Sequence, residues 1–141
     1  MATPQRVHVV HEFTSDPQTV FEKLSEHENL GPVFGAKVTR VKDGDTSRNG
    51  AGSVRRLKIG ILPAFEETTL KAEPNTLIEY AITKGGPLRG HWGRQELSPT
   101  PSGGTKLVYT IGFNAPLPGM AGVVAKQLTA GLAKGLPKLT P

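Results

Sequence analysis

Apolar and polar residues alternate along much of this chain, in short runs that turn-forming residues separate. Alternation with a period of two is typical of β-strands that have one face in a core and the other in water. The run at 88–97 gives the weakest prediction, because two glycines interrupt it and glycine inside a strand often marks a bulge. The predicted strands cover residues 5–14, 36–42, 53–61, 65–72, 77–83, 88–97 and 105–113.

A helical period replaces the alternation after the first strand. Asp16 can accept hydrogen bonds from the free N–H groups of a helix start, and Pro17 suits the first helical position. A short apolar stripe follows, which predicts a helix of about two turns that ends before Gly31-Pro32, with a second short turn at 26–30. The stripe consists of Val20, Phe21 and Leu24.

The segment at 117–136 is the second helical region and the longer one. Its apolar residues recur at helical spacing, which predicts a long helix with one apolar face that Pro137 ends. Gly122, Gly131 and Gly135 lower the helix propensity, but they would let the helix approach a sheet closely. The apolar positions are Met120, Val123, Val124, Leu128, Leu132 and Leu136.

The order of these elements indicates the fold class. Strands in unbroken succession form antiparallel sheets, and helices grouped at the ends of a sequence are typical of α+β domains. We therefore predict a single α+β domain over residues 1–141. In it, a curved antiparallel sheet of about six to seven strands wraps around the long C-terminal helix. Two short helices follow the first strand.

Composition narrows the class of protein. The chain has 141 residues, of which 36% are hydrophobic and 21% charged, a balance that suits one globular domain. No run approaches about eighteen apolar residues, and the N-terminal sequence lacks the features of a signal peptide, so we expect no membrane insertion. Cysteine is absent, which excludes disulfides and thiol nucleophiles and is compatible with the cytoplasmic location that we expect.

The net charge of +5 raises the question of an acidic partner. Nucleic-acid sites usually cluster basic residues with aromatics among them. Here the basic residues are scattered, the densest group being Arg55-Arg56 with Lys58, and aromatics make up only 6% of the chain. We therefore expect a solvated basic surface and no nucleic-acid partner.

The chain contains no recognisable metal, cofactor or nucleophile motif. His8 and His11 point to opposite faces of a strand, and no HExxH-type spacing exists, so we expect no metal site. Gly50-Ala51-Gly52 precedes a strand, whereas a dinucleotide site needs its glycines before a helix, so we expect no cofactor. No GxSxG sequence is present.

Five polar residues share the inward face of apolar neighbours on the predicted strands. A buried Arg55 needs a counter-charge, for which Glu67 is the candidate, either as a structural ion pair or as the polar end of a ligand cavity. Tyr80 and Tyr109 fit core packing better than a cavity, and a bulge could change the face of His91. With the helix included, the candidate ligand-binding residues are Arg55, Glu67, Tyr80, His91, Tyr109, Met120, Val124 and Leu128.

Several motifs, in this order and spacing, resemble the START-related (SRPBCC) superfamily, which includes polyketide cyclase/dehydrase-like proteins and the birch-pollen-allergen type. The first strand is followed by DPQTVFEKLSEHENL, and GAGSVRRL resembles the family's glycine-rich entry to a strand. The run from Glu67 to Tyr80, the hairpin at 103–105 and the C-terminal helix complete a resemblance over nearly the whole chain. The chain departs from the pattern in its GDTSRNGAG loop and in the glycine-broken strand at 88–97.

The resemblance implies a helix-grip fold with a cavity between the sheet and the long helix. It also implies binding of lipids, polyketides, sterols, hormones or aromatic compounds, in some members with cyclase or hydratase activity. Arg55 matches the family's arginine after the glycines, and Tyr80 matches the residue that closes the next strand. The family has no universal catalytic set, so the resemblance assigns no catalytic residue.

Three functions are compatible with the sequence. The first, which we favour, is binding of a small hydrophobic molecule by a monomer or homodimer. The second is a metal-free enzyme of the cyclase, dehydratase or aromatase kind, with His91, Glu67 or a tyrosine as general acid or base. The third is an interaction module that uses the basic surface.

Overall fold

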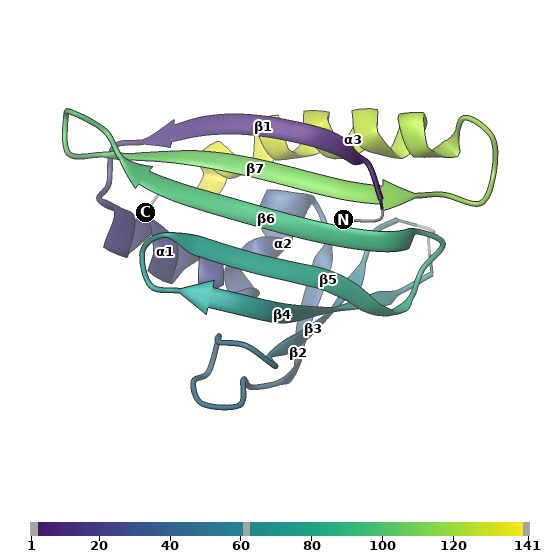
Figure 1. Cartoon of the computed structure of the whole chain (residues 1–141). Coiled ribbons are helices and arrows are strands. Elements are labelled where there is room, and N and C mark those ends of the chain that lie inside the picture. Colours follow the sequence, from purple (N-terminus) through teal and green to yellow (C-terminus); the bar gives the residue numbers. More distant parts are fainter. Residues whose placement is uncertain (1–2, 61–62, 140–141) are drawn as a thin grey trace.

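Seven strands form one antiparallel sheet in the computed structural model, which describes residues 3–60 and 63–139 (Figure 1). Their order across the sheet is β1-β7-β6-β5-β4-β3-β2, so each strand lies beside its neighbour in sequence except β1, which pairs with the last strand. The predicted antiparallel sheet is thereby confirmed. The strands are β1 (Gln5–Phe13), β2 (Lys37–Lys42), β3 (Val54–Lys58), β4 (Phe65–Glu73), β5 (Leu77–Gly85), β6 (Arg89–Pro99) and β7 (Thr105–Asn114).

One strand prediction needs correction and the weakest one is confirmed. The strand expected at 53–61 pairs only from Val54 to Lys58, and Ile61 lies outside the described residues. The strand predicted at 88–97 corresponds to β6, the longest strand among the described residues. Within β6, Gly93 leaves room for the ring of Tyr80, because a Cβ at this position would lie 2.2 Å from Tyr80 Cζ.

The sheet bends at several register shifts. They occur in the pairings of β1 with β7, β2 with β3, β4 with β5 and β6 with β7. The shift in β6 includes Gly90, whose φ of 60° lies in the left-handed region that glycine tolerates. Such shifts increase the local twist and bend the strand, so the sheet curves, and its concave face is the one that the helices cover (Figure 1).

The short helices after β1 follow the prediction in number but not in their bounds. In α1 (Pro17–Ser25), the Asp16 carboxylate accepts a hydrogen bond from the Thr19 N–H at 2.9 Å, as expected for a capping residue. A 3₁₀ turn (His27–Asn29) leads into α2 (Leu30–Phe34), which contains Gly31-Pro32 instead of ending before it. Pro32 is tolerated because the first turn of a helix has no use for its N–H.

The long C-terminal helix, α3, spans Met120–Gly135 and continues as a 3₁₀ turn at Leu136–Leu139. The predicted helix at 117–136 therefore starts too early, because 117–119 belong to the loop after β7. Pro137 does not end the helical path, since it occupies the second residue of the 3₁₀ turn, where its missing N–H is not needed.

Helix α3 is more deeply buried at its C-terminal end than at its N-terminal end. Leu132 and Leu136 are buried in the core, whereas Val123 is 58% exposed and the apolar residues at 121–128 that pack against the core are only partly buried. The expectation that the glycines bring α3 close to the sheet is wrong: Gly135 meets the backbone of Val33 in α2, and a Cβ at Gly122 would meet nothing within 4 Å. The closest backbone approach made through these glycines is therefore between α3 and α2.

A buried histidine joins the 3₁₀ turn to the sheet. His27 Nε2 lies 3.2 Å from Ser53 Oγ, at the entry to β3. Burial lowers the pKa of His27 to about 4, and the positive charges of Arg55 and Arg40 act in the same direction. The folded protein therefore keeps this imidazole neutral under conditions in which an exposed histidine takes up a proton.

We expect the protein to lose stability as the pH falls from 6.5 towards 4. In that range His27 binds a proton in the unfolded chain and not in the folded one, so acid favours unfolding. The expected loss is about 1 kcal/mol per pH unit, roughly 3 kcal/mol in total, and urea unfolding at several pH values measures it. His27→Gln, which can keep the Ser53 hydrogen bond, should flatten this dependence; equal slopes in both proteins would contradict the assignment to His27.

Candidate functional site

A cavity of about 620 Å³ lies between the concave face of the sheet and α3. Strands β3 to β7 form one wall, α3 forms the opposite wall, and Phe34 of α2 contributes between them. The lining is apolar apart from four side chains. The size and the lining are typical of sites for small molecules, which hold about 300–1,000 Å³ and few polar groups. The polar lining residues are Glu67, Tyr80, His91 and Gln127.

Part of the α3 wall of the cavity carries little side-chain volume. At Gly131, which lines the cavity, a Cβ would meet nothing within 4 Å. Val124 adds only a short side chain to the same wall. The space between these positions and the sheet therefore remains open.

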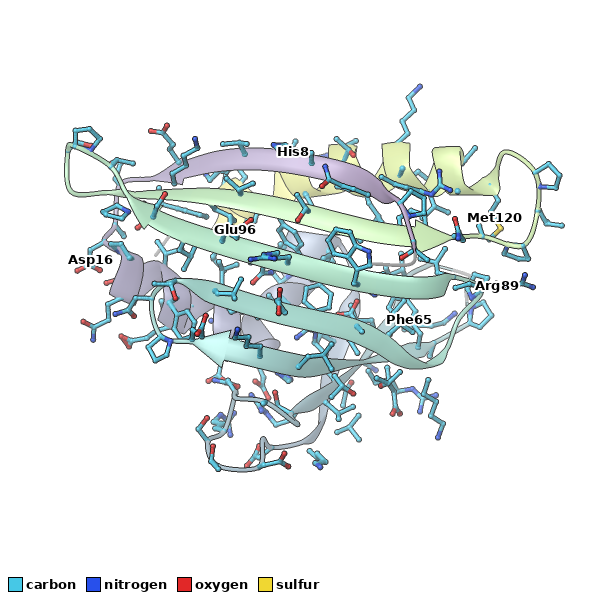
Figure 2. The ribbon with its side chains drawn as sticks, viewed as in Figure 1. His8, Asp16, Phe65, Arg89, Glu96 and Met120 are labelled. Atoms are coloured by element: carbon cyan, nitrogen blue, oxygen red, sulfur yellow. The ribbon has the colours of Figure 1, made fainter. Side chains whose placement is uncertain are left out.

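The mouth of the cavity lies at the end of the sheet where α3 begins. The loops at 86–88 and 117–119 both line the cavity, and Figure 1 shows the β5–β6 and β7–α3 connections at the same end of the sheet. Figure 2 labels Phe65, Arg89 and Met120 at this end. Leu117 is 66% exposed here. Exposed apolar side chains at a rim are typical of an entrance for an apolar molecule.

A buried ion pair lies at the polar side of the cavity. Arg55 on β3 and Glu67 on β4 are directly opposite in the register, so their side chains share the inner face. Arg55 Nε donates to Glu67 Oε1 at 2.9 Å, and Nη2 lies 2.7 Å from the same oxygen. The two side chains are only 4% and 5% exposed. The pairing expected from the sequence is thus confirmed, and the Arg55 guanidinium also lies 4.7 Å from the centre of the Tyr80 ring.

His91 stands beside this ion pair. Its Nδ1 accepts a hydrogen bond from the Ile82 N–H at 3.1 Å, and its Nε2 lies 4.0 Å from Glu67 Oε2. Burial lowers the pKa of His91, and Arg55 lowers it further against the opposing effect of Glu67. The ring is therefore neutral near pH 7, and because Nδ1 is an acceptor, the proton is on Nε2.

Two buried tyrosines extend the polar side into the core. The hydroxyl groups of Tyr80 and Tyr109 hydrogen-bond to each other, and burial raises the pKa of both phenols. Tyr80 lines the cavity and Tyr109 does not. The hydroxyl that reaches the cavity wall is thus neutral and already has a partner.

The structure brings most of the candidate residues together and places two behind the wall. Arg55 and Tyr109 do not line the cavity; they lie behind Glu67 and Tyr80, which they contact. Alternation along a strand predicts the face of a residue but not its depth, which explains this difference. The candidates that line the cavity are Glu67, Tyr80, His91, Met120, Val124 and Leu128.

Several lining residues are not among those predicted from the sequence. Gln127 could have been found, because it lies four residues after Val123 and four before Gly131, on one row of the helix. Phe34 and the two loops at the mouth carry no periodic signal, since their positions depend on how the chain turns between elements.

The described part of the chain contains neither a metal-binding cluster nor a membrane-spanning helix. Residues 3–60 and 63–139 contain no group of three or more His, Cys, Asp or Glu side chains that could hold a metal ion. Among the helices formed by these residues, none has the length and apolar character needed to cross a membrane.

Comparison with known proteins gives the family. The model of the family described as "Polyketide cyclase / dehydrase and lipid transport" matches residues 4–140. The chain belongs to this family. The match spans almost the whole sequence and agrees with the resemblance seen in its motifs. No curated protein sequence matches significantly.

Solved structures agree on the fold of this member of the polyketide cyclase/dehydrase and lipid-transport family. A START superfamily protein from Mycobacterium smegmatis has a TM-score of 0.79 at 18% identity, with 95% of each chain covered. A protein from Thermus thermophilus gives 0.75 at 18% identity, with 97% of each chain covered. A norcoclaurine synthase from Thalictrum flavum, solved with a transition-state analogue, gives 0.69 at 16% identity, covering 99% of this chain and 96% of that one. At such identities the likeness shows the helix-grip fold of the START superfamily alone.

Proposed function

We propose that this protein binds a small apolar or amphipathic molecule in the cavity between the sheet and α3. Family and fold indicate a domain that binds hydrophobic ligands. The observation that carries the proposal is the cavity of about 620 Å³, whose lining is apolar except at one side. An apolar molecule that moves from water into such a space gains the free energy of burying its surface.

Binding fits His91 and Tyr80 better than acid–base catalysis does. A general base must have a free lone pair near the substrate. His91 directs a proton into the cavity from Nε2, because its lone pair on Nδ1 accepts from the Ile82 N–H. Burial raises the pKa of Tyr80, which makes the phenol a weak acid, and its hydroxyl is bonded to Tyr109. These residues are arranged to hold a polar group in place.

We expect Gly131→Leu to weaken the binding of anilinonaphthalene sulfonate, an amphipathic fluorescent probe with an apolar ring system, by at least about tenfold. The new side chain has open space only towards the cavity and would occupy part of it. Gly122→Leu is the matched control, because it makes the same change on an exposed position of the same helix. Fluorescence titration measures both variants. Equal binding by the two variants would contradict the proposed site.

The natural ligand can be sought directly. Native mass spectrometry of the protein purified from its own host should reveal a bound molecule, and Gly131→Leu should release it while Gly122→Leu retains it. A ligand that both variants retain would place the binding site elsewhere on the protein.

A further inference from the structure

Two polar atoms on the cavity wall face each other without forming a hydrogen bond. Glu67 Oε2 and His91 Nε2 are 4.0 Å apart, whereas an N–H···O hydrogen bond spans about 2.7–3.2 Å. The other carboxylate oxygen of Glu67 is occupied by Arg55. Both side chains line the cavity. The gap between the two atoms is therefore open to a group on a bound molecule.

The two atoms have opposite hydrogen-bonding roles. Glu67 Oε2 belongs to a carboxylate and is an acceptor. His91 Nε2 carries a proton and is a donor, because Nδ1 accepts from the Ile82 N–H and the ring is neutral. The polar side of the cavity thus offers one acceptor and one donor, both directed at the same place.

A single oxygen atom can satisfy both groups. An oxygen about 2.8 Å from each atom fits the 4.0 Å gap, with the two hydrogen bonds meeting at roughly 90°. The group must donate to Glu67 and accept from His91 at one atom, which a hydroxyl does. An ether or a ketone lacks the donor, an ammonium lacks the acceptor, and a carboxylate would be repelled by Glu67.

The charge of this corner also favours a neutral group. Arg55 and Glu67 form a buried ion pair whose charges cancel, and His91 beside them is neutral. A charged ligand group would have to leave water without gaining a counter-charge of its own. A neutral hydroxyl avoids that penalty.

We propose, on the basis of the binding function above, that the ligand is a neutral apolar molecule with an alcohol or phenol group, whose hydroxyl bridges Glu67 Oε2 and His91 Nε2. The remainder of the molecule lies against the apolar walls formed by residues such as Phe65, Val124 and Leu128. This makes Glu67 and His91 the residues that select the ligand by its hydroxyl group.

Matched probes test the proposal on the unaltered protein. β-Naphthol and its methyl ether have the same ring system, but only the naphthol can donate to Glu67. Isothermal titration calorimetry should show that the naphthol binds at least about tenfold more tightly, because the ether leaves a buried acceptor without a partner. Naphthoate and a naphthylmethylammonium salt should bind more weakly than the naphthol. Equal affinities for the naphthol and its ether would overturn the proposal.

Two variants test whether His91 is the hydrogen-bond donor to the ligand. His91→Phe keeps an aromatic ring but removes the donor, so it should weaken binding of the naphthol by about three- to tenfold and leave binding of naphthalene, which has no oxygen, unchanged. Val124→Ala, on the apolar wall, should weaken naphthol and naphthalene alike. Unchanged affinity for the naphthol in His91→Phe would contradict the proposal. Where His91→Phe fails to fold, the probe comparison on the unaltered protein decides.

The outcomes separate this inference from the function on which it rests. If Gly131→Leu weakens both naphthalene probes and the wild-type protein binds them equally, the cavity is a binding site but the hydroxyl bridge is wrong. If neither these probes nor anilinonaphthalene sulfonate binds the wild-type protein, both the proposed function and the hydroxyl bridge are wrong.

Discussion

Replacing Glu67 with alanine is expected to lower the free energy of unfolding by about 3–5 kcal/mol. The change leaves Arg55 buried, at 4% exposure, with no counter-charge for its guanidinium. A charge in that position loses its hydration and regains nothing from the protein. Since whole domains are stable by only about 5–15 kcal/mol, the variant should unfold at far lower urea concentration, as circular dichroism can measure.

Two controls separate the loss of charge pairing from the loss of a side chain. Glu66→Ala alters the adjacent residue of β4, which lies opposite the exposed Arg56, and should change stability by about 1 kcal/mol or less. A double variant, Arg55→Met with Glu67→Leu, removes both charges and should be more stable than Glu67→Ala alone. Similar losses in Glu66→Ala and Glu67→Ala would show that the ion pair does not have the predicted effect.

Gly135→Ala should destabilise the protein by about 3 kcal/mol, although alanine is normally the better helix former. A Cβ at this position would lie 2.0 Å from the carbonyl oxygen of Val33 and 2.7 Å from its carbonyl carbon. Both are backbone atoms of α2 and cannot move aside as a flexible side chain would. The C-terminal end of α3 would have to shift, at a cost typical of overpacked cores.

Gly122→Ala is the matched control for this prediction. It makes the same substitution on the same helix, where a Cβ meets nothing within 4 Å. There the higher helix propensity of alanine should raise stability by up to about 1 kcal/mol. Thermal unfolding followed by circular dichroism should therefore show shifts of opposite sign. A gain in stability for Gly135→Ala would mean that α2 and α3 are not in close contact in solution.

The sequence predicted the sheet well because strand alternation is a local property. Each run of alternating residues corresponds to a strand, and alternation alone indicates the inward faces of Arg55 and Glu67, which pair in the structure. The order of the elements along the chain then sufficed for the fold class, since hairpin connections between successive strands make an antiparallel sheet.

The cavity could be predicted only in part, because its shape depends on the distance between α3 and the sheet. A stripe of apolar residues at helical spacing indicates which face of α3 turns inward, but not that Val124 and Leu128 line an open space while Leu136 is fully buried. The position of α3 depends in part on the contact of Gly135 with α2. No local pattern in the sequence encodes a contact between two helices so far apart in the chain.

His91 shows a second limit to what the sequence can predict. The bulge before it, at Gly90, decides which face of β6 it occupies, so simple counting from Leu97 was not decisive. The hydrogen bond from the Ile82 N–H to Nδ1 depends on where β5 and β6 lie relative to each other. The position of its proton is therefore a property of the folded structure.

The pairing of β1 with β7 has a consequence for how the protein is made. Val9 in the first strand lies opposite Tyr109 in the last, so the sheet cannot be completed until the residues of β7 have been synthesised. Contacts between residues so distant in sequence slow folding, because a long loop must close before they form. During synthesis the strands from β2 onwards can pair with their neighbours, but β1 has no partner strand until β7 has been made. The cavity also needs α3, which follows β7 in the chain, so it can form only after every strand of the sheet has been synthesised.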